Sequence, residues 1–206
     1  MQSTHSPRWI AAALLSLASL APAPAPGQTQ SGTLGIYFDP AGTVCSGTIR
    51  PDTPGTIHIL ARLEGTSAAG IAGAEFRIGG IPETWETYPV PNPTMFSLGD
   101  PFANGVVGTF TKCQSPENGI VSFYTVLVLA SALEENLQFT LSMRNPPSNP
   151  GFACPLVLLC DAPAYSQTCV EAQPCFVNPT AARTCNRPTP VDDRTWSQVK
   201  GLYRSR

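Results

Sequence analysis

The sequence is short of the residues that most enzymes use for catalysis. Only two of its 206 residues are histidine, His5 and His58, and the second lies on the polar side of an alternating segment. No GxSxG elbow, no glycine-rich phosphate loop and no CxxC pair occurs. The usual signatures of serine or cysteine hydrolases, phosphate-binding loops and zinc sites are therefore missing. We expect no enzyme activity, no cofactor and no metal.

Charge is also scarce, since only 13% of the residues are Asp, Glu, Lys or Arg, and the net charge is −2 without any block of one sign. This removes the usual electrostatic reason to propose a nucleic acid or an anionic membrane as partner. The adjacent carboxylates Glu83/Glu86 and Glu134/Glu135 fall in loop-like segments, where solvated acids are expected. A hydrolase that uses them as a catalytic pair is the least favoured function.

The N-terminus has the layout of a signal peptide. Arg8 precedes the apolar run Trp9–Leu20, and alanines follow between prolines up to residue 26. This run is too short to span a bilayer. We therefore assign residues 1–26 to a signal peptide and expect a secreted, periplasmic or cell-surface protein. No later segment approaches transmembrane length, so we expect no membrane insertion after cleavage.

Seven cysteines follow the predicted signal peptide: Cys45, Cys113, Cys154, Cys160, Cys169, Cys175 and Cys185. In an exported chain we expect disulfides, with Cys45–Cys113 and Cys175–Cys185 as the preferred pairs. A third bridge would come from Cys154, Cys160 and Cys169, and the odd thiol would lie in that set. Because seven is odd, a dimer through the unpaired cysteine is a further possibility.

The chain after residue 26 reads as a series of short strands separated by loops rich in Pro and Gly, which predicts an antiparallel β-sandwich. We assign this domain to residues 27–186, including its Cys-rich tail. Residues 187–206 form a Pro-rich linker and a short C-terminal helix, with Trp196, Val199 and Tyr203 on one side. The predicted strands are 34–38, 56–63, 74–78, 106–112, 120–130, 137–143, 156–160, 168–171 and 175–177, with an edge strand at best around 84–88.

Gly55–Ile78 is the most regular part of this pattern. In its first strand Ile57 and Ile59 share a face, whereas Leu60 breaks the alternation and should contact a neighbouring loop. In its second strand Phe76 is apolar, and Glu75 points to the polar side. The link between the strands is long for a tight turn, so a hairpin and a crossing between two sheets are both open. We expect this pair to form one wall of the sandwich and residues 120–130 and 137–143 the other.

Trp85, Tyr88 and Phe96 form the only concentrated aromatic group outside the main strands, and they are the candidate ligand-binding residues. They could stack on sugar rings or form an energetic centre for a protein contact. The alternative, which we favour, is that they close the open end of the sandwich.

The segment from Pro54 to Ile78 resembles the start of cohesin-like modules. In these a PG turn leads into an alternating strand, a Gly-rich link and a G-x-E-F-x-I/L strand, here Pro54-Gly55, Thr56–Leu63 and Gly73–Ile78. The resemblance implies a jelly-roll β-sandwich, related in fold to carbohydrate-binding modules, that acts by binding. The Cys-rich tail departs from it. The layout as a whole also resembles secreted bacterial proteins.

Together these features predict an exported, non-enzymatic module that binds an unidentified protein or glycan. A disulfide-stabilised structural protein of the envelope or matrix is the alternative.

Overall fold

The computed structural model describes residues 32–63, 70–160 and 165–185. The predicted signal peptide and the predicted C-terminal linker and helix lie outside these ranges. Every regular element within these ranges is a β-strand. The described segments contain no helix that is long and apolar enough to cross a membrane. The strands are β1 (Gly32–Tyr37), β2 (Ser46–Gly47), β3 (Gly55–Leu63), β4 (Ile71–Gly79), β5 (Glu86–Pro91), β6 (Met95–Asp100), β7 (Gly105–Gln114), β8 (Ile120–Leu129), β9 (Leu137–Ser142), β10 (Leu156–Leu159), β11 (Ser166–Cys169), β12 (Glu171–Gln173) and β13 (Cys175–Val177).

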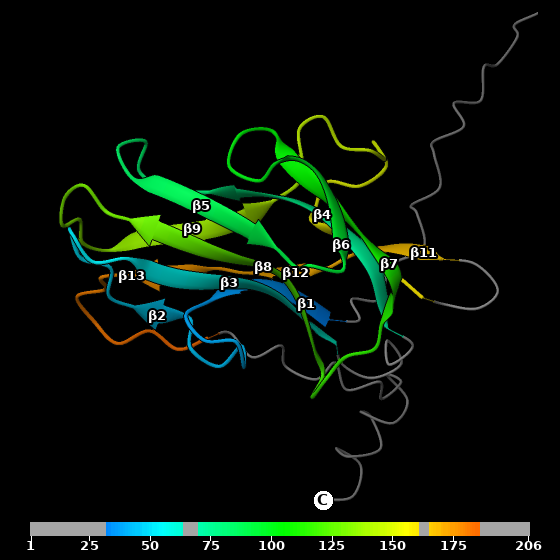
Figure 1. Ribbon diagram of the computed structural model, residues 1–206, viewed down its shortest axis with the longest axis horizontal. Helices are drawn as coiled ribbons and strands as arrows, with labels where there is room; N and C mark the ends of the chain where they lie inside the picture. Colours follow the sequence, from blue (N-terminus) through cyan, green and yellow to red (C-terminus); the bar gives the residue numbers. More distant parts are fainter. Residues whose placement is uncertain (1–31, 64–69, 161–164, 186–206) are drawn as a thin grey trace, which may run out of the picture.

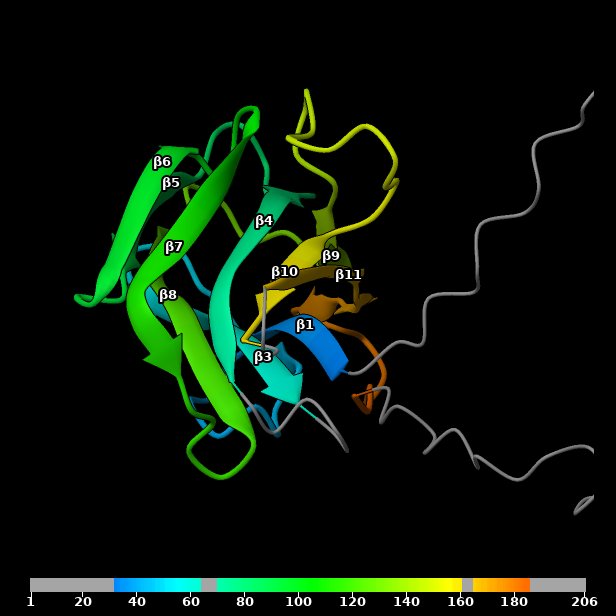
Figure 2. The ribbon, with the colours of Figure 1, turned by 90° about the vertical axis from the view of Figure 1, so that its right-hand side faces the viewer.

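These strands form two sheets that pack face to face, which confirms the predicted β-sandwich (Figures 1 and 2). The first sheet has the order β12-β1-β3-β8-β5. The second follows the path β11-β10-β4-β9-β13-β2, and its strand β4 also pairs with β7, which pairs in turn with β6. Most neighbours are antiparallel, whereas the short pairs β1–β12 and β13–β2 are parallel.

The core lies between the sheets and is built from the apolar face of each strand. Phe76 of β4 meets the rings of Phe123 and Tyr124 of β8 edge-on, and Trp85 meets Phe139 of β9 in the same way. All five side chains are 95% or more buried. Because successive strand residues point to opposite faces, the period-two pattern in the sequence predicts this core correctly for β3, β4 and β9.

We expected β3 and β4 to form one wall of the sandwich, but they lie in different sheets. β3 pairs with β1 and β8 in the first sheet, and β4 pairs with β7, β9 and β10 in the second. The link between them is therefore a crossing, and the two predicted walls are each divided between both sheets. Local alternation shows that a strand has one buried face, but it does not show which strand lies beside it.

Leu60 contacts a loop on the outer face of the first sheet, as predicted. Leu60 points away from the main core because it alternates along β3 with Ile59 and Ala61, which both face that core. It packs instead with Tyr37 and Cys45 in a small second cluster. The register of β3 against β8 shifts at this point and leaves Phe123 of β8 without a partner on β3. This bulge lets the consecutive residues Phe123 and Tyr124 both face the core without ending β8.

The disulfides join Cys45 to Cys185, Cys113 to Cys160 and Cys154 to Cys169. The predicted pairs Cys45–Cys113 and Cys175–Cys185 are therefore wrong, whereas one bridge within the set of Cys154, Cys160 and Cys169 is confirmed. The prediction that the odd thiol lies in this set is also wrong, because all three of its cysteines are bridged. The free thiol belongs to Cys175, which lies in the core with no exposed surface. A buried thiol cannot reach a second molecule, so the structure contradicts a dimer through the odd cysteine.

Candidate binding surface

The three aromatic residues singled out in the sequence do not form one surface. Trp85 is 5% exposed and packs on Phe139, so it completes the core. Tyr88 lies on β5 of the first sheet and Phe96 on β6 of the second, and both are exposed. Trp85 therefore closes the core, which is the alternative we favoured for it. The three side chains do not form a shared binding platform.

Tyr88 belongs to a small apolar patch on the outer face of the first sheet. It lies opposite Leu127 of β8, and Val90 lies two residues further along the same edge strand. All three are exposed, and the hydroxyl of Tyr88 donates to Oε2 of Glu86 at 2.6 Å.

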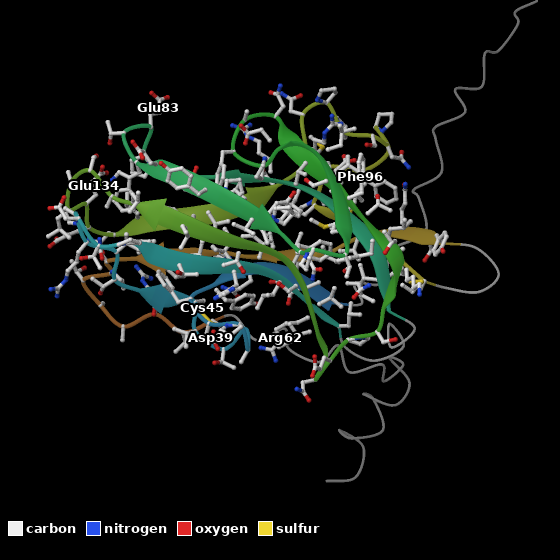
Figure 3. All side chains as sticks on the ribbon, in the orientation of Figure 1. Asp39, Cys45, Arg62, Glu83, Phe96 and Glu134 are labelled. Carbon is white, nitrogen blue, oxygen red and sulfur yellow. A yellow bond between two sulfur atoms is a disulfide. The ribbon has the colours of Figure 1, made fainter. Side chains whose placement is uncertain are left out.

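Phe96 belongs to a second apolar patch, on the outer face of the other sheet. Phe96 and Leu98 are exposed by 68% and 62% and occupy alternate positions of the edge strand β6, so they point the same way. Figure 3 shows Phe96 directed away from the sandwich. Met95 and Ser97 face inward, where Met95 enters the core and Ser97 is hydrogen-bonded to the hydroxyl of Tyr124.

This second patch continues across the sheet in two rows of paired residues. The first row is Leu98, Val107, Glu75 and Leu156, from β6, β7, β4 and β10. The second row is Phe96, Thr109, Gly73 and Leu158 from the same strands. We call the surface formed by these eight residues the outer β6–β10 face.

A pocket of about 100 Å³ opens on the outer β6–β10 face. Its floor is formed by β4 and β7, and its walls by β10, Ser148 and Gln167. Glu75 lines this pocket and is only 6% exposed. The sequence pattern correctly placed Glu75 on the face of β4 that points away from the core. It also predicted that Glu75 contacts water there, and this prediction is wrong because the side chain is buried.

Glu75 is covered by the loop between β9 and β10, which is attached to the sheet at three points. The backbone N–H of Ser148 donates to Oε1 of Glu75 at 2.9 Å. The side-chain amide of Asn149 donates to Oε1 of Gln167 at 2.8 Å. The disulfide Cys154–Cys169 joins the end of this loop to β11. The pocket is therefore formed before any ligand arrives.

Larger hollows lie elsewhere but offer less chemistry. One of about 620 Å³ lies beside the disulfide Cys45–Cys185 and is lined by loop residues that include Arg183. Another of about 520 Å³ lies beside Asn178 and Leu133. Their charged lining residues, Arg183 in the first and Arg50 and Glu135 in the second, are all exposed to solvent.

The remaining titratable residues do not form a catalytic set among the described residues. His58 projects from the outer face of β3 and has Thr125 Oγ1 3.4 Å from its Nδ1. Desolvation lowers the pKa of His58, and the charge of Asp39 opposes this change. Glu83 and Glu134 lie on separate loops and point to solvent (Figure 3). In the part of the chain that the structure describes, no three His, Cys, Asp or Glu side chains are grouped to hold a metal.

Asp39 has a structural role in the loop after β1. Its carboxylate accepts hydrogen bonds from the backbone N–H groups of Thr43 and Val44 and from the Thr43 hydroxyl. Burial raises the pKa of Asp39, but these hydrogen bonds together lower it below its ordinary value. Asp39 therefore holds this loop over the outer face of the first sheet, beside the small cluster around Leu60.

The sequence indicated neither the strand β6 nor the burial of Glu75. Both depend on residues distant in the chain: β6 is ordered by pairing with β7, and Glu75 is covered by the loop that contains Ser148. One signal was available for β6. The short segment Met95-Phe96-Ser97-Leu98 contains three large apolar residues directly after the turn residues Asn92-Pro93.

Comparisons with known proteins found structural likenesses only. No protein-family model and no curated protein matches the chain. A cohesin module from a family 33 glycoside hydrolase of Clostridium perfringens is 13% identical and covers 73% of this chain and 99% of its own, with a TM-score of 0.44. The sixth cohesin of Acetivibrio cellulolyticus scaffoldin B, solved with a mutant Cel5 dockerin, is 10% identical, covers 72% and 99%, and has a TM-score of 0.46.

The seventh ScaB type I cohesin of Pseudobacteroides cellulosolvens is 8% identical, covers 81% of this chain and 99% of its own, and has a TM-score of 0.45. These structures are cohesin modules, the class of β-sandwich that the segment from Pro54 to Ile78 resembles.

Proposed function

We propose that this chain is an exported, non-enzymatic module that binds a protein through the outer β6–β10 face. The observation that carries this proposal is the exposure of Phe96 and Leu98, side by side on one face of an edge strand. The three disulfides support a location outside the reducing cytoplasm, because such bonds persist mainly in oxidising compartments.

Covering this patch would release a useful amount of free energy. Full burial of a Phe or Leu side chain contributes about 1.5–3 kcal/mol each, and each of these two side chains still exposes more than half of its surface. Aromatic and aliphatic anchors that are close together are typical of the centre of a protein interface. The neighbouring pocket adds a recess into which a partner side chain could insert.

A protein is favoured over a glycan as the ligand of this face. Sugar rings are usually held by flat aromatic platforms together with polar groups. Of the three aromatic candidates, only Phe96 lies on the outer β6–β10 face, and its neighbour Leu98 is aliphatic. Trp85, the best stacking residue of the three, is inside the core.

The test is a selection of binding peptides from a random display library against the intact, oxidised protein. We expect selected peptides to lose about tenfold or more of their affinity for the double variant Phe96→Ala/Leu98→Ala. The matched control is Tyr88→Ala/Val90→Ala, which removes the exposed apolar pair of the opposite sheet and should leave binding unchanged. Peptides that respond only to the control variant, or selective ligands found only on a glycan array, would contradict the proposal.

A further inference from the structure

Glu75 is a carboxylate that is almost fully buried without a cation beside it. Its exposed fraction is 6%, and its hydrogen-bond partner is the backbone N–H of Ser148 on Oε1. Among the described residues no Lys or Arg group forms an ion pair with it: Arg77 is exposed, and Arg144, on the loop that covers Glu75, donates through Nη1 to the carbonyl of Pro146. Buried Glu side chains are rare unless they are paired, because one neutral donor does not replace the lost hydration.

The carboxylate faces the pocket on the outer β6–β10 face, which has the size of one side chain. Its volume of about 100 Å³ is well below the roughly 300–1,000 Å³ of sites for drug-sized molecules. Val107, Leu156 and Leu158 supply apolar walls around the single acidic group. A largely apolar recess that contains one acidic side chain matches a long side chain with an aliphatic stem and a cationic head.

A bare metal ion fits this pocket poorly. Divalent cations in proteins take several oxygen ligands, commonly six or more for calcium. In the described residues no second acidic side chain joins Glu75 in a group that could hold a metal. A cationic side chain needs only one carboxylate partner and brings its own hydrogen-bond donors.

Resting on the proposed function, we propose that the partner inserts a lysine or arginine side chain into this pocket, with Glu75 as its counter-ion. The pairing of the strands gives the spacing. Leu98 lies opposite Val107, and Val107 lies opposite Glu75, so Leu98 and Glu75 are two strand separations apart, about 10 Å. The partner thus carries an apolar residue over Phe96 and Leu98 and a basic residue about 10 Å away.

A direct test uses n-butylammonium chloride, which reproduces the end of a lysine side chain, in a titration followed by the amide NMR signals of the oxidised protein. We expect saturable shifts at Gly73, Val107 and Leu158. Neutral n-butanol should bind roughly tenfold more weakly or worse, because it lacks the charge that Glu75 recognises. Equal responses to the two compounds in the wild-type protein would overturn the proposal without the use of any variant.

Glu75→Gln provides the second arm, because its amide oxygen can still accept from Ser148. We expect it to lose binding of butylammonium by about tenfold or more, whereas Glu86→Gln on the first sheet should not. Unchanged binding by Glu75→Gln would contradict the role of its charge.

The display-selected peptides separate this inference from the proposed function. Peptides that require Phe96 and Leu98 but contain no basic residue, and that bind Glu75→Gln normally, would refute only the basic side chain. A failure to obtain any peptide that depends on Phe96 and Leu98 would refute the binding face itself.

Discussion

Replacement of Phe76 by alanine should destabilise the protein strongly, because this side chain joins the two sheets. Phe76 projects from β4 of the second sheet with no exposed surface. Its ring lies 6.2 Å from that of Phe123 and 5.9 Å from that of Tyr124, both on β8 of the first sheet and both edge-on. A buried Phe→Ala change costs about 3–5 kcal/mol, to which each lost ring pair contributes about 0.5–1.5 kcal/mol. We therefore expect a loss of about 4 kcal/mol.

Urea unfolding of the oxidised protein measures this loss, and the expected decrease in the midpoint is roughly 2 M. The matched control is Phe96→Ala, the same chemical change at a position that is 68% exposed. It should change the free energy of unfolding by no more than about 0.5 kcal/mol. A loss below about 1 kcal/mol for Phe76→Ala, or equal losses for the two variants, would show that Phe76 does not join the sheets as described.

Burial raises the pKa of Cys175 to about 12. We therefore expect iodoacetamide to modify this thiol only after the protein has unfolded. Detection of an adduct on the native protein by intact mass spectrometry would contradict the burial of Cys175. The lowered pKa of His58 means that the folded state binds its proton less readily than the unfolded state. The free energy of unfolding should therefore fall as the pH drops below about 6.5, and His58→Gln, otherwise nearly neutral, should lack that decrease. Asp39→Asn should cost about 1 kcal/mol or less at neutral pH. The pKa of Asp39 is lowered in the folded state. The extra free energy of unfolding of the wild type over Asp39→Asn should therefore disappear as the pH falls below about 3.8 and through the folded pKa. Urea unfolding at several pH values measures this difference.

Much of the strand pattern could be predicted because the alternation of apolar and polar residues along a strand shows which of its faces is buried. Ile57 and Ile59 alternate with polar neighbours, and both are fully buried. The segment 120–130 is apolar and rich in β-branched residues, and β8 lies between β3 and β5 in its sheet. The edge position of β5 also follows from the sequence, because Pro89 and Pro91 lack the N–H groups that a central strand requires.

The pairing of cysteines could not be predicted in the same way. Cys45 and Cys185 are 140 residues apart, yet their Cα atoms lie 5.3 Å from each other. They meet because β13, which precedes Cys185, pairs in parallel with β2, which begins directly after Cys45. The spacing of the cysteines along the chain does not indicate this strand pairing, so the preferred pairs Cys45–Cys113 and Cys175–Cys185 were wrong.

The candidate binding site was only partly visible in the sequence. Phe96 was recognised as a candidate, but it was grouped with Trp85 and Tyr88, which are its neighbours in sequence and not on its surface. Leu98 and Glu75 were not recognised as site residues at all. Their proximity depends on β6, β7 and β4 being adjacent in one sheet, which is a property of the topology.

The sequence by itself determined that the chain is a β-sandwich with a low charge, many cysteines and no standard catalytic motif, because composition and period-two burial are local properties. Tertiary structure alone decided which strands are neighbours, which cysteines pair and which side chains share a surface. Glu75 shows the physical reason most clearly. Its position on the polar side of a strand is set by alternation, but its burial is set by a loop that begins about 70 residues later and donates the N–H of Ser148 to it.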